Sequence, residues 1–215
     1  MNIGKNDTAL VLTDPQNDVL SESGVAWPFV GAGIRENRTV ENIERLLRAA
    51  KDNGYGVFVS PHYCYPSQRL WRFGGTFEHV EDELNSFARK GPLTLEGFAG
   101  SGADWLERYK PYIEDGQTVM VSPHKVYGPE SNDLVLQLRR FGIGKVILGG
   151  MLANLCVEAH LRELTEQGFE VAVVRDATAA PRHPKLGDGY PGALVNFGFI
   201  ASAVLSTDDA VKAMR

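Results

Sequence analysis

The chain has 215 residues, 43% of them hydrophobic, which is enough to bury a full core within one domain spanning residues 1–215. Its formal net charge of −5, with no block of basic residues, argues against a nucleic-acid partner. The apolar runs are too short to cross a membrane, and the N-terminus lacks a signal-peptide pattern, which predicts a cytoplasmic protein. In that compartment Cys64 and Cys156 are expected to stay reduced.

Strand-like and helix-like segments alternate along the chain. Short apolar runs predict strands at 9–12, 57–60, 118–121, 146–148, 171–174 and 200–205. Apolar residues at helical spacing predict helices at 40–50, 80–87, 103–113, 132–141, 155–164, 191–197 and 208–214. This alternation predicts an α/β fold with a mostly parallel, six-stranded sheet and helices on both faces.

Two segments are predicted to be irregular. Residues 21–34 carry several glycines around Trp27 and are expected to form a loop. Residues 61–100 mix aromatic side chains with glycine and proline. Long ordered loops of this kind often serve as lids or contact surfaces, and the alternative is a satellite hydrophobic cluster that serves stability alone.

Three reactive side chains each follow a predicted strand by a few residues: Asp14, Lys125 and Cys156. The carboxyl ends of parallel strands meet at one edge of a sheet, so we expect these side chains to lie close together. Asp14 can take the thiol proton, while Lys125 can hold the carboxylate and lower the thiol pKa. The alternatives are a turn-forming aspartate, an exposed lysine and a small buried cysteine.

Histidines offer a rival partner for the cysteine. Neighbouring side chains in an extended segment point to opposite faces, so His124 is not expected to share a pocket with Lys125. His160 lies one helical turn beyond Cys156 and is expected to point away from the mouth of the site. Asn154 is a good N-cap, which would place Cys156 in the first turn of a helix, where the helix dipole favours a thiolate.

Three blocks of the chain resemble the signature blocks of the isochorismatase-like cysteine hydrolases: ALVLTDPQNDVL, PHKV and GGMLANLCVEAHLRELTEQGFEVAVVRDATAA. This family includes nicotinamidases, ureidoacrylate and biuret amidohydrolases, maleamate amidases and N-carbamoylsarcosine amidase. The resemblance implies a Rossmann-like three-layer fold and a triad of Asp14, Lys125 and Cys156. Members that cleave the vinyl ether of isochorismate lack the cysteine, so Cys156 points to hydrolysis of a C–N bond.

The resemblance also implies features of the backbone and the assembly. These are a cis peptide bond between Met151 and Leu152, an oxyanion hole made by the backbone N–H groups of Leu152 and Cys156, and a homodimer or higher homo-oligomer. The aromatic loop 63–98, with Trp71, is then expected to cover its own or a neighbouring active site. The family usually has small residues before the cysteine, whereas this chain has Met151, Leu152 and Ala153, which predicts a differently shaped pocket floor.

The same family suggests where a metal would bind. In nicotinamidases an aspartate and a histidine after the second strand hold a metal, and the matching positions here are His62 and Cys64. Nicotinamide is therefore not the favoured substrate. A metal site would need a third ligand, such as Glu78 or His79, and the thiolate route needs no Lewis acid, so we expect no metal and no cofactor.

The expected substrate is a small amide, ureido or carbamoyl compound. The side chains expected to bind it are Gln16, Trp27, Tyr63, Trp71, Tyr127 and Asn154. Two other classes stay open, because a fold does not fix a function. One is a non-catalytic binding or assembly protein. The other is a redox protein that uses Cys64 and Cys156, which is less favoured because neither cysteine has a CxxC partner.

Overall fold

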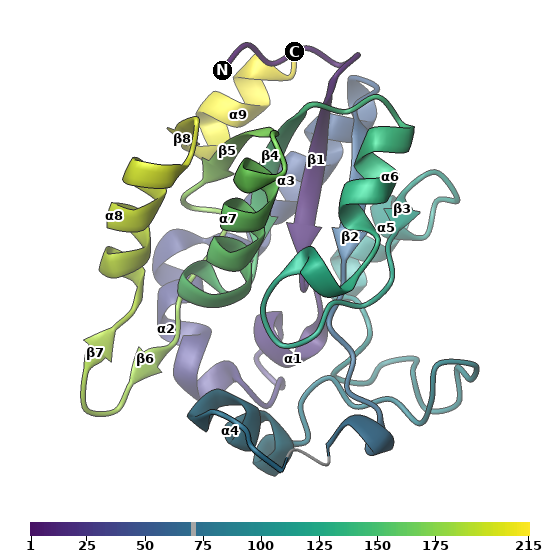
Figure 1. The fold of residues 1–215 in the computed structure, drawn as a ribbon, viewed down its shortest axis with the longest axis vertical. Helices are drawn as coiled ribbons and strands as arrows, with labels where there is room; N and C mark the ends of the chain where they lie inside the picture. The colour runs from purple at the N-terminus through teal and green to yellow at the C-terminus, as the bar shows by residue number, and fades with distance from the viewer. Residues whose placement is uncertain (70–71) are drawn as a thin grey trace.

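A parallel sheet of six strands runs through the centre of the molecule, which this computed structural model describes over residues 1–69 and 72–215 (Figure 1). The strands are β1 (Thr8–Thr13), β2 (Gly56–Ser60), β3 (Val119–Met120), β4 (Lys145–Gly150), β5 (Glu170–Val174) and β8 (Ala203–Leu205). Their order is β3-β2-β1-β4-β5-β8, and every neighbouring pair is parallel. The predicted fold class is confirmed, and all six predicted strands are present.

Helices cover both faces of the sheet (Figure 1). The helices of the described residues are α1 (Asn17–Leu20), α2 (Trp27–Asn37), α3 (Thr39–Asp52), α4 (Thr76–Leu84), α5 (Lys110–Ile113), α6 (Leu134–Arg140), α7 (Glu158–Glu166), α8 (Tyr190–Ile200) and α9 (Thr207–Ala213), of which α1 and α4 lie beyond the carboxyl ends of the strands (Figure 1). Helices α2, α3 and α9 share a core with Leu10 of β1, and α6, α7 and α8 share one with Val11. Strand β1 therefore supplies both cores from its alternating side chains. Among the described residues, no helix is long and apolar enough to cross a membrane.

Helix α2 lies where a loop was predicted. The glycine that suggested a loop serves close packing instead, because a Cβ on Gly31 would lie 2.5 Å from the Trp27 ring. Pro28 also suggested a loop, but it occupies the first turn of α2, where its missing N–H is not needed. The expectation of an irregular segment at 21–34 is therefore corrected.

Three further segments differ from the expectation. Helix α4 begins at Thr76, four residues before its predicted start. Residues 103–113 are α-helical only in α5, because the buried Asp104 carboxylate accepts hydrogen bonds from the backbone N–H groups of Gly100 and Trp105 and ties this stretch into a turn. The loop before α8 contains a small antiparallel hairpin of β6 (Arg182–His183) and β7 (Gly187–Asp188).

The order in which the chain adds strands to the sheet reverses between β1 and β4. The chain leaves β1 towards β2 on one side and leaves β4 towards β5 on the other, so a crevice opens at the carboxyl ends of these two strands. Thr13 lies opposite Gly150, which brings the two strand ends level. Gly150 has φ 111° and a Cβ there would lie 2.1 Å from the Thr13 carbonyl oxygen, so only glycine fits this close approach.

Candidate active site

Asp14 is the first residue after β1 and is buried at the switch point of the sheet. Its backbone is left-handed, with φ 48°, a conformation that aspartate tolerates better than most residues. Its N–H donates to the carbonyl of Ser60 at the end of β2, 3.1 Å away. The backbone that carries this carboxylate is thus tied to the neighbouring strand.

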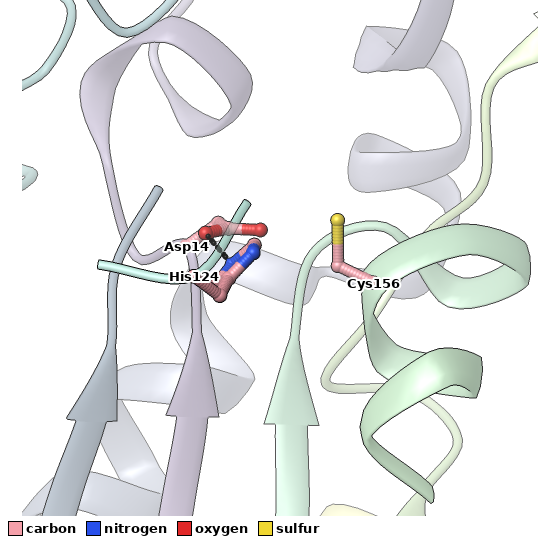
Figure 2. Close-up of side chains that lie close together, drawn as sticks. All are labelled: Asp14, His124 and Cys156. Carbon is pink, nitrogen blue, oxygen red and sulfur yellow. Dashed lines mark hydrogen bonds and ion pairs between the residues drawn. The ribbon is translucent and has the colours of Figure 1, made fainter. Parts of the chain in front are cut away.

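His124 is the partner of Asp14. The imidazole is fully buried, and its Nε2 lies 2.8 Å from Asp14 Oδ1 (Figure 2). Its Nδ1 lies 2.6 Å from the carbonyl oxygen of Lys125. A carbonyl and a carboxylate only accept hydrogen bonds, so a ring that donates from both nitrogens is an imidazolium. The pair is therefore an ion pair with a cation supplied by histidine.

The charge of His124 decides the ionisation of Asp14. Burial raises the pKa of the Asp14 carboxyl, but the charge of His124, its hydrogen bond and the charge of His62 lower it by more. The net pKa lies below its usual range, so Asp14 is a carboxylate at neutral pH.

Lys125 does not contact Asp14, and the expected assignment of this lysine is corrected. Its side chain is exposed, while its backbone N–H donates to Ser131 Oγ, 2.9 Å away. The reason is the alternation of an extended segment, in which only one of two neighbouring side chains can face the sheet edge. His124 is that residue, since its N–H donates to the Pro61 carbonyl and holds the segment alongside the end of β2.

Cys156 lies in a π-helical turn, Ala153–Val157, between β4 and α7. Leu152 precedes this turn as its N-cap, so Asn154 is not the cap that the sequence suggested. The Val157 N–H reaches back to the Leu152 carbonyl, 3.1 Å away. Single π turns of this kind are frequent at functional sites. The turn places Cys156 across the crevice from Asp14 and His124 (Figure 2).

The Cys156 sulfur is a thiol and not a resting thiolate. Burial, followed by the charges of Asp14 and Glu81, raises its pKa well above the usual value, and the hydrogen bond from the Leu152 backbone lowers it by less. The Sγ atom lies 3.3 Å from the Val126 carbonyl, to which it donates. The expectation of a thiolate stabilised by the helix dipole is therefore corrected, because burial favours the neutral thiol.

The three groups converge. One ligand-type atom each of Asp14, His124 and Cys156 lies within 4.8 Å of the others. The peptide between Met151 and Leu152 is cis, as the resemblance implied. A nucleophile and a base held by a cation thus face each other at the sheet edge.

A second buried cluster lies next to this site. His62 stacks on His124 with ring centroids 5.2 Å apart, and its Nε2 lies 3.4 Å from Cys64 Sγ and 3.6 Å from Glu81 Oε1. Burial lowers the pKa of His62, but Cys64 and Glu81 raise it by more, to well above its usual value. The donor set of imidazole, thiol and carboxylate is one that zinc accepts. Its third member is Glu81, and not Glu78 or His79.

Two of the expected substrate-binding residues serve the scaffold instead. The side-chain amide of Gln16 donates to the carbonyls of His62 and Ala103 and accepts from the His62 N–H, so its hydrogen bonds are used. The Tyr63 ring is buried against Phe98 and Trp105. Both residues connect the aromatic segment to the sheet.

The other expected residues are distributed over the molecule. Trp27 lines a separate groove of about 800 Å³ between α1, α2 and the start of α3, and none of the three site residues lines that groove. Trp71 is outside the described residues. Asn154 Oδ1 is buried, and no hydrogen-bond partner is found for it among the described residues.

Tyr127 lies near the site. Its ring packs against Phe77 of α4, with centroids 6.0 Å apart. Burial and then the charges of Glu78, Glu81 and Cys156 raise the pKa of its hydroxyl to about 12, so the hydroxyl keeps its proton and can donate. A role for Tyr127 in binding substrate stays a prediction.

Comparisons with known proteins identify the family of the chain. A family model described as the isochorismatase domain matches residues 8–186. The ureidoacrylate amidohydrolase RutB of Variovorax paradoxus is 26% identical over 180 residues, covering 80% of this chain and 69% of that protein. The isochorismatase family protein YwoC of Bacillus subtilis is 30% identical over 185 residues, covering 82% of this chain and 80% of that protein.

Solved structures share the fold. A cysteine hydrolase from Pseudomonas syringae pv. phaseolicola superposes with a TM-score of 0.79 at 20% identity, covering 100% of this chain and 95% of that one. The nicotinamidase/pyrazinamidase PncA from Bacillus subtilis gives a TM-score of 0.66 at 20% identity, covering 93% of this chain and 99% of that one.

Proposed function

This chain belongs to the isochorismatase family of hydrolases, and from that membership and the geometry of its site we propose that it hydrolyses a C–N bond in a small amide, ureido or carbamoyl compound. The observation that carries the proposal is the convergence of Cys156 with the Asp14–His124 ion pair within 4.8 Å. The likeness to ureidoacrylate amidohydrolases supports the same bond type. A cysteine at this position forms an acyl-enzyme.

The first half of the reaction forms a thioester. Asp14 removes the thiol proton as Cys156 attacks the substrate carbonyl. Because the thiol pKa is raised and the Asp14 pKa is lowered, this transfer is unfavourable on its own and is coupled to attack. The backbone N–H groups of Leu152 and Cys156 receive the oxyanion, each contributing about 3 kcal/mol. Asp14 then gives its proton to the departing ammonia or amine.

The second half regenerates the thiol. Asp14 takes a proton from a water molecule, which attacks the thioester carbonyl, and the same N–H groups hold the second oxyanion. When the intermediate collapses, the C–S bond breaks and Cys156 regains the proton from Asp14. His124 stays an imidazolium throughout and holds Asp14 in position through its 2.8 Å contact.

The test is a screen of small amides, ureas and carbamoyl compounds read by ammonia release. We expect Cys156→Ala to abolish release while the melting temperature changes by only a few degrees, since the side chain lies at the sheet edge. Cys64→Ala is the matched control and should retain turnover. Wild-type turnover by Cys156→Ala would overturn the proposal, and a wild-type chain that neither turns over the panel nor reacts at Cys156 would favour a binding protein.

We also propose that the chain works as a homo-oligomer in the cytoplasm. Cys64 and Cys156 are both free thiols, a state that a reducing compartment maintains. Exposed aromatic surface supports the assembly, since Phe73 is 84% exposed.

A further inference from the structure

His160 is a buried imidazole that the proposed reaction does not use. It lies on α7 and is fully buried, and it points to the end of β2 and not away from the site as expected. Its Nδ1 lies 2.7 Å from the carbonyl oxygen of Cys156, and its Nε2 lies 2.9 Å from Ser60 Oγ. One side chain therefore bridges the turn that carries the nucleophile and the strand beside Asp14.

The hydrogen bonds fix the protonation of this ring. The Cys156 carbonyl can only accept, so Nδ1 carries the proton. Ser60 Oγ accepts from the side-chain amide of Asn132 at 2.9 Å, which leaves its own proton free for Nε2. A neutral imidazole satisfies every partner. Burial, with the nearby charge of His124, lowers the pKa of His160 to about 3, in agreement with a neutral ring.

His160 also contacts the cation of the site. Its ring meets that of His124 edge to face, with centroids 5.0 Å apart and planes at 80°. A second imidazole, that of His62, stacks on His124. His124 thus contacts two other imidazoles, while its own nitrogens are held by Asp14 and a carbonyl.

We infer that His160 is a positioning residue that sets the separation between Cys156 and the Asp14–His124 pair. A π turn closes i→i+5 bonds in place of the α-helical ones, and the bond from the His160 ring gives the Cys156 carbonyl a partner 2.7 Å away. The same ring limits the movement of His124. The inference rests on the proposed role of Cys156, and a displacement of about 1 Å in such a site can cost roughly 100-fold in rate.

The test measures alkylation of Cys156 by iodoacetamide from pH 6 to pH 10, followed by mass spectrometry, in a Cys64→Ala background. His160→Leu removes both contacts, and we expect its rate to fall by about tenfold or more across the profile. His160→Asn keeps a donor at the place of Nδ1 and should stay within about threefold of the parent rate. Leu161→Ala, at an equally buried neighbour on α7, is the matched control and should lower stability without changing the profile.

A His160→Leu rate equal to that of the parent, or a His160→Asn rate as low as that of His160→Leu, would overturn the inference. Where His160→Leu does not fold, His160→Asn is compared with His160→Gln, which keeps a partner for Ser60 alone. Slower alkylation of Cys156 in His160→Gln than in His160→Asn supports the inference, and equal alkylation rates in these two variants contradict it. A parent thiol that is inert and a chain that hydrolyses nothing would instead count against the proposed function.

Discussion

At the scale of single residues, the identity of the cation at the site depends on one step of backbone alternation. His124 and Lys125 are neighbours, and only the histidine faces Asp14. The two residues also differ chemically, because an imidazolium donates from two fixed ring nitrogens whereas a lysine ammonium sits on a flexible stem. The cation that holds Asp14 is therefore fixed in direction by its second contact, to the Lys125 carbonyl.

Substitution of these two neighbours separates their roles. We expect His124→Gln to slow alkylation of Cys156 at every pH below the thiol pKa, because Asp14 loses its counter-charge and the thiol pKa rises further. Lys125→Met is the matched control, and its rate-versus-pH curve should overlay that of the wild type, since this side chain is exposed. A slower Lys125→Met variant with an unchanged His124→Gln variant would restore the lysine to the site.

The sequence predicted Asp14 and Cys156 because both follow strands at the sheet edge, and that placement needs only the strand–helix pattern. It could not choose between His124 and Lys125, since the choice depends on how the segment after β3 pairs with residue 62. The buried Glu81 is the partner of His62, and it lies beyond the irregular segment on a different element, so no local spacing reveals this contact.

The neutral His160 makes stability depend on pH. Its pKa falls from 6.5 to about 3 on folding, so between these values the unfolded chain binds a proton that the folded chain does not. The free energy of unfolding therefore falls as pH drops through this window, by about 1.4 kcal/mol per pH unit. We expect urea unfolding to show a loss of roughly 2 kcal/mol from pH 6.5 to pH 5 attributable to this residue.

Comparison with a variant isolates that contribution. His160→Gln should show a smaller loss over the same range, whereas His183→Gln, at an exposed histidine, should behave as the wild type does. His62 has the opposite sign, because its raised pKa contributes stability below 6.5 that is lost only as pH rises through the folded value. Identical pH dependence in wild type and His160→Gln would show that the ring is not buried neutral.

At the scale of elements, the local pattern predicted the strands well and the surroundings of the site less well. Every central strand is an apolar run buried on both faces, which is the strongest signal a parallel sheet gives. Helix α2 was missed because Gly31 is required by the Trp27 ring and not by a turn. The π turn was missed because its residues have helical composition, and the extra residue per turn follows from tertiary contacts.

Helix α4 brings Glu81 to His62 and Cys64, and this contact sets up a test for a metal. We expect dialysis against EDTA to leave turnover unchanged, because Cys156, Asp14 and the backbone N–H groups supply the chemistry. Native mass spectrometry before and after dialysis should give the mass of the metal-free chain. Glu81→Gln is the companion variant. If no metal is bound, this substitution removes the counter-charge of His62, and the pKa of the His62 imidazole should fall relative to that in the wild type. Loss of turnover on chelation, with recovery on adding zinc, would identify the cluster as a metal site.

At the scale of the whole molecule, helix α8 and residues 72–100 are two of the places where large apolar side chains are exposed. Helix α8 is apolar on most of its faces and exposes Val195 and Phe199, the latter by 87%. Residues 72–100 expose Phe73 and Leu93. A helix that is apolar all round is normally buried, and large exposed apolar patches mark interaction sites. Both surfaces are therefore candidates for a contact between copies of the chain.

Light scattering at micromolar concentration is expected to give the mass of a dimer or larger assembly. Phe199→Glu should reduce that mass if α8 forms the contact, because a charge at the centre of an apolar interface is not compensated there. Phe73→Glu should do so if the aromatic segment forms it, and should also change the apparent affinity for substrate if that segment covers an active-site mouth. Gln117→Glu, at an exposed polar position away from both surfaces, adds the same single negative charge and is the control for charge alone. A monomer mass for the wild-type chain would contradict the assembly. The segment 72–100 would then be expected to cover the active site of its own chain.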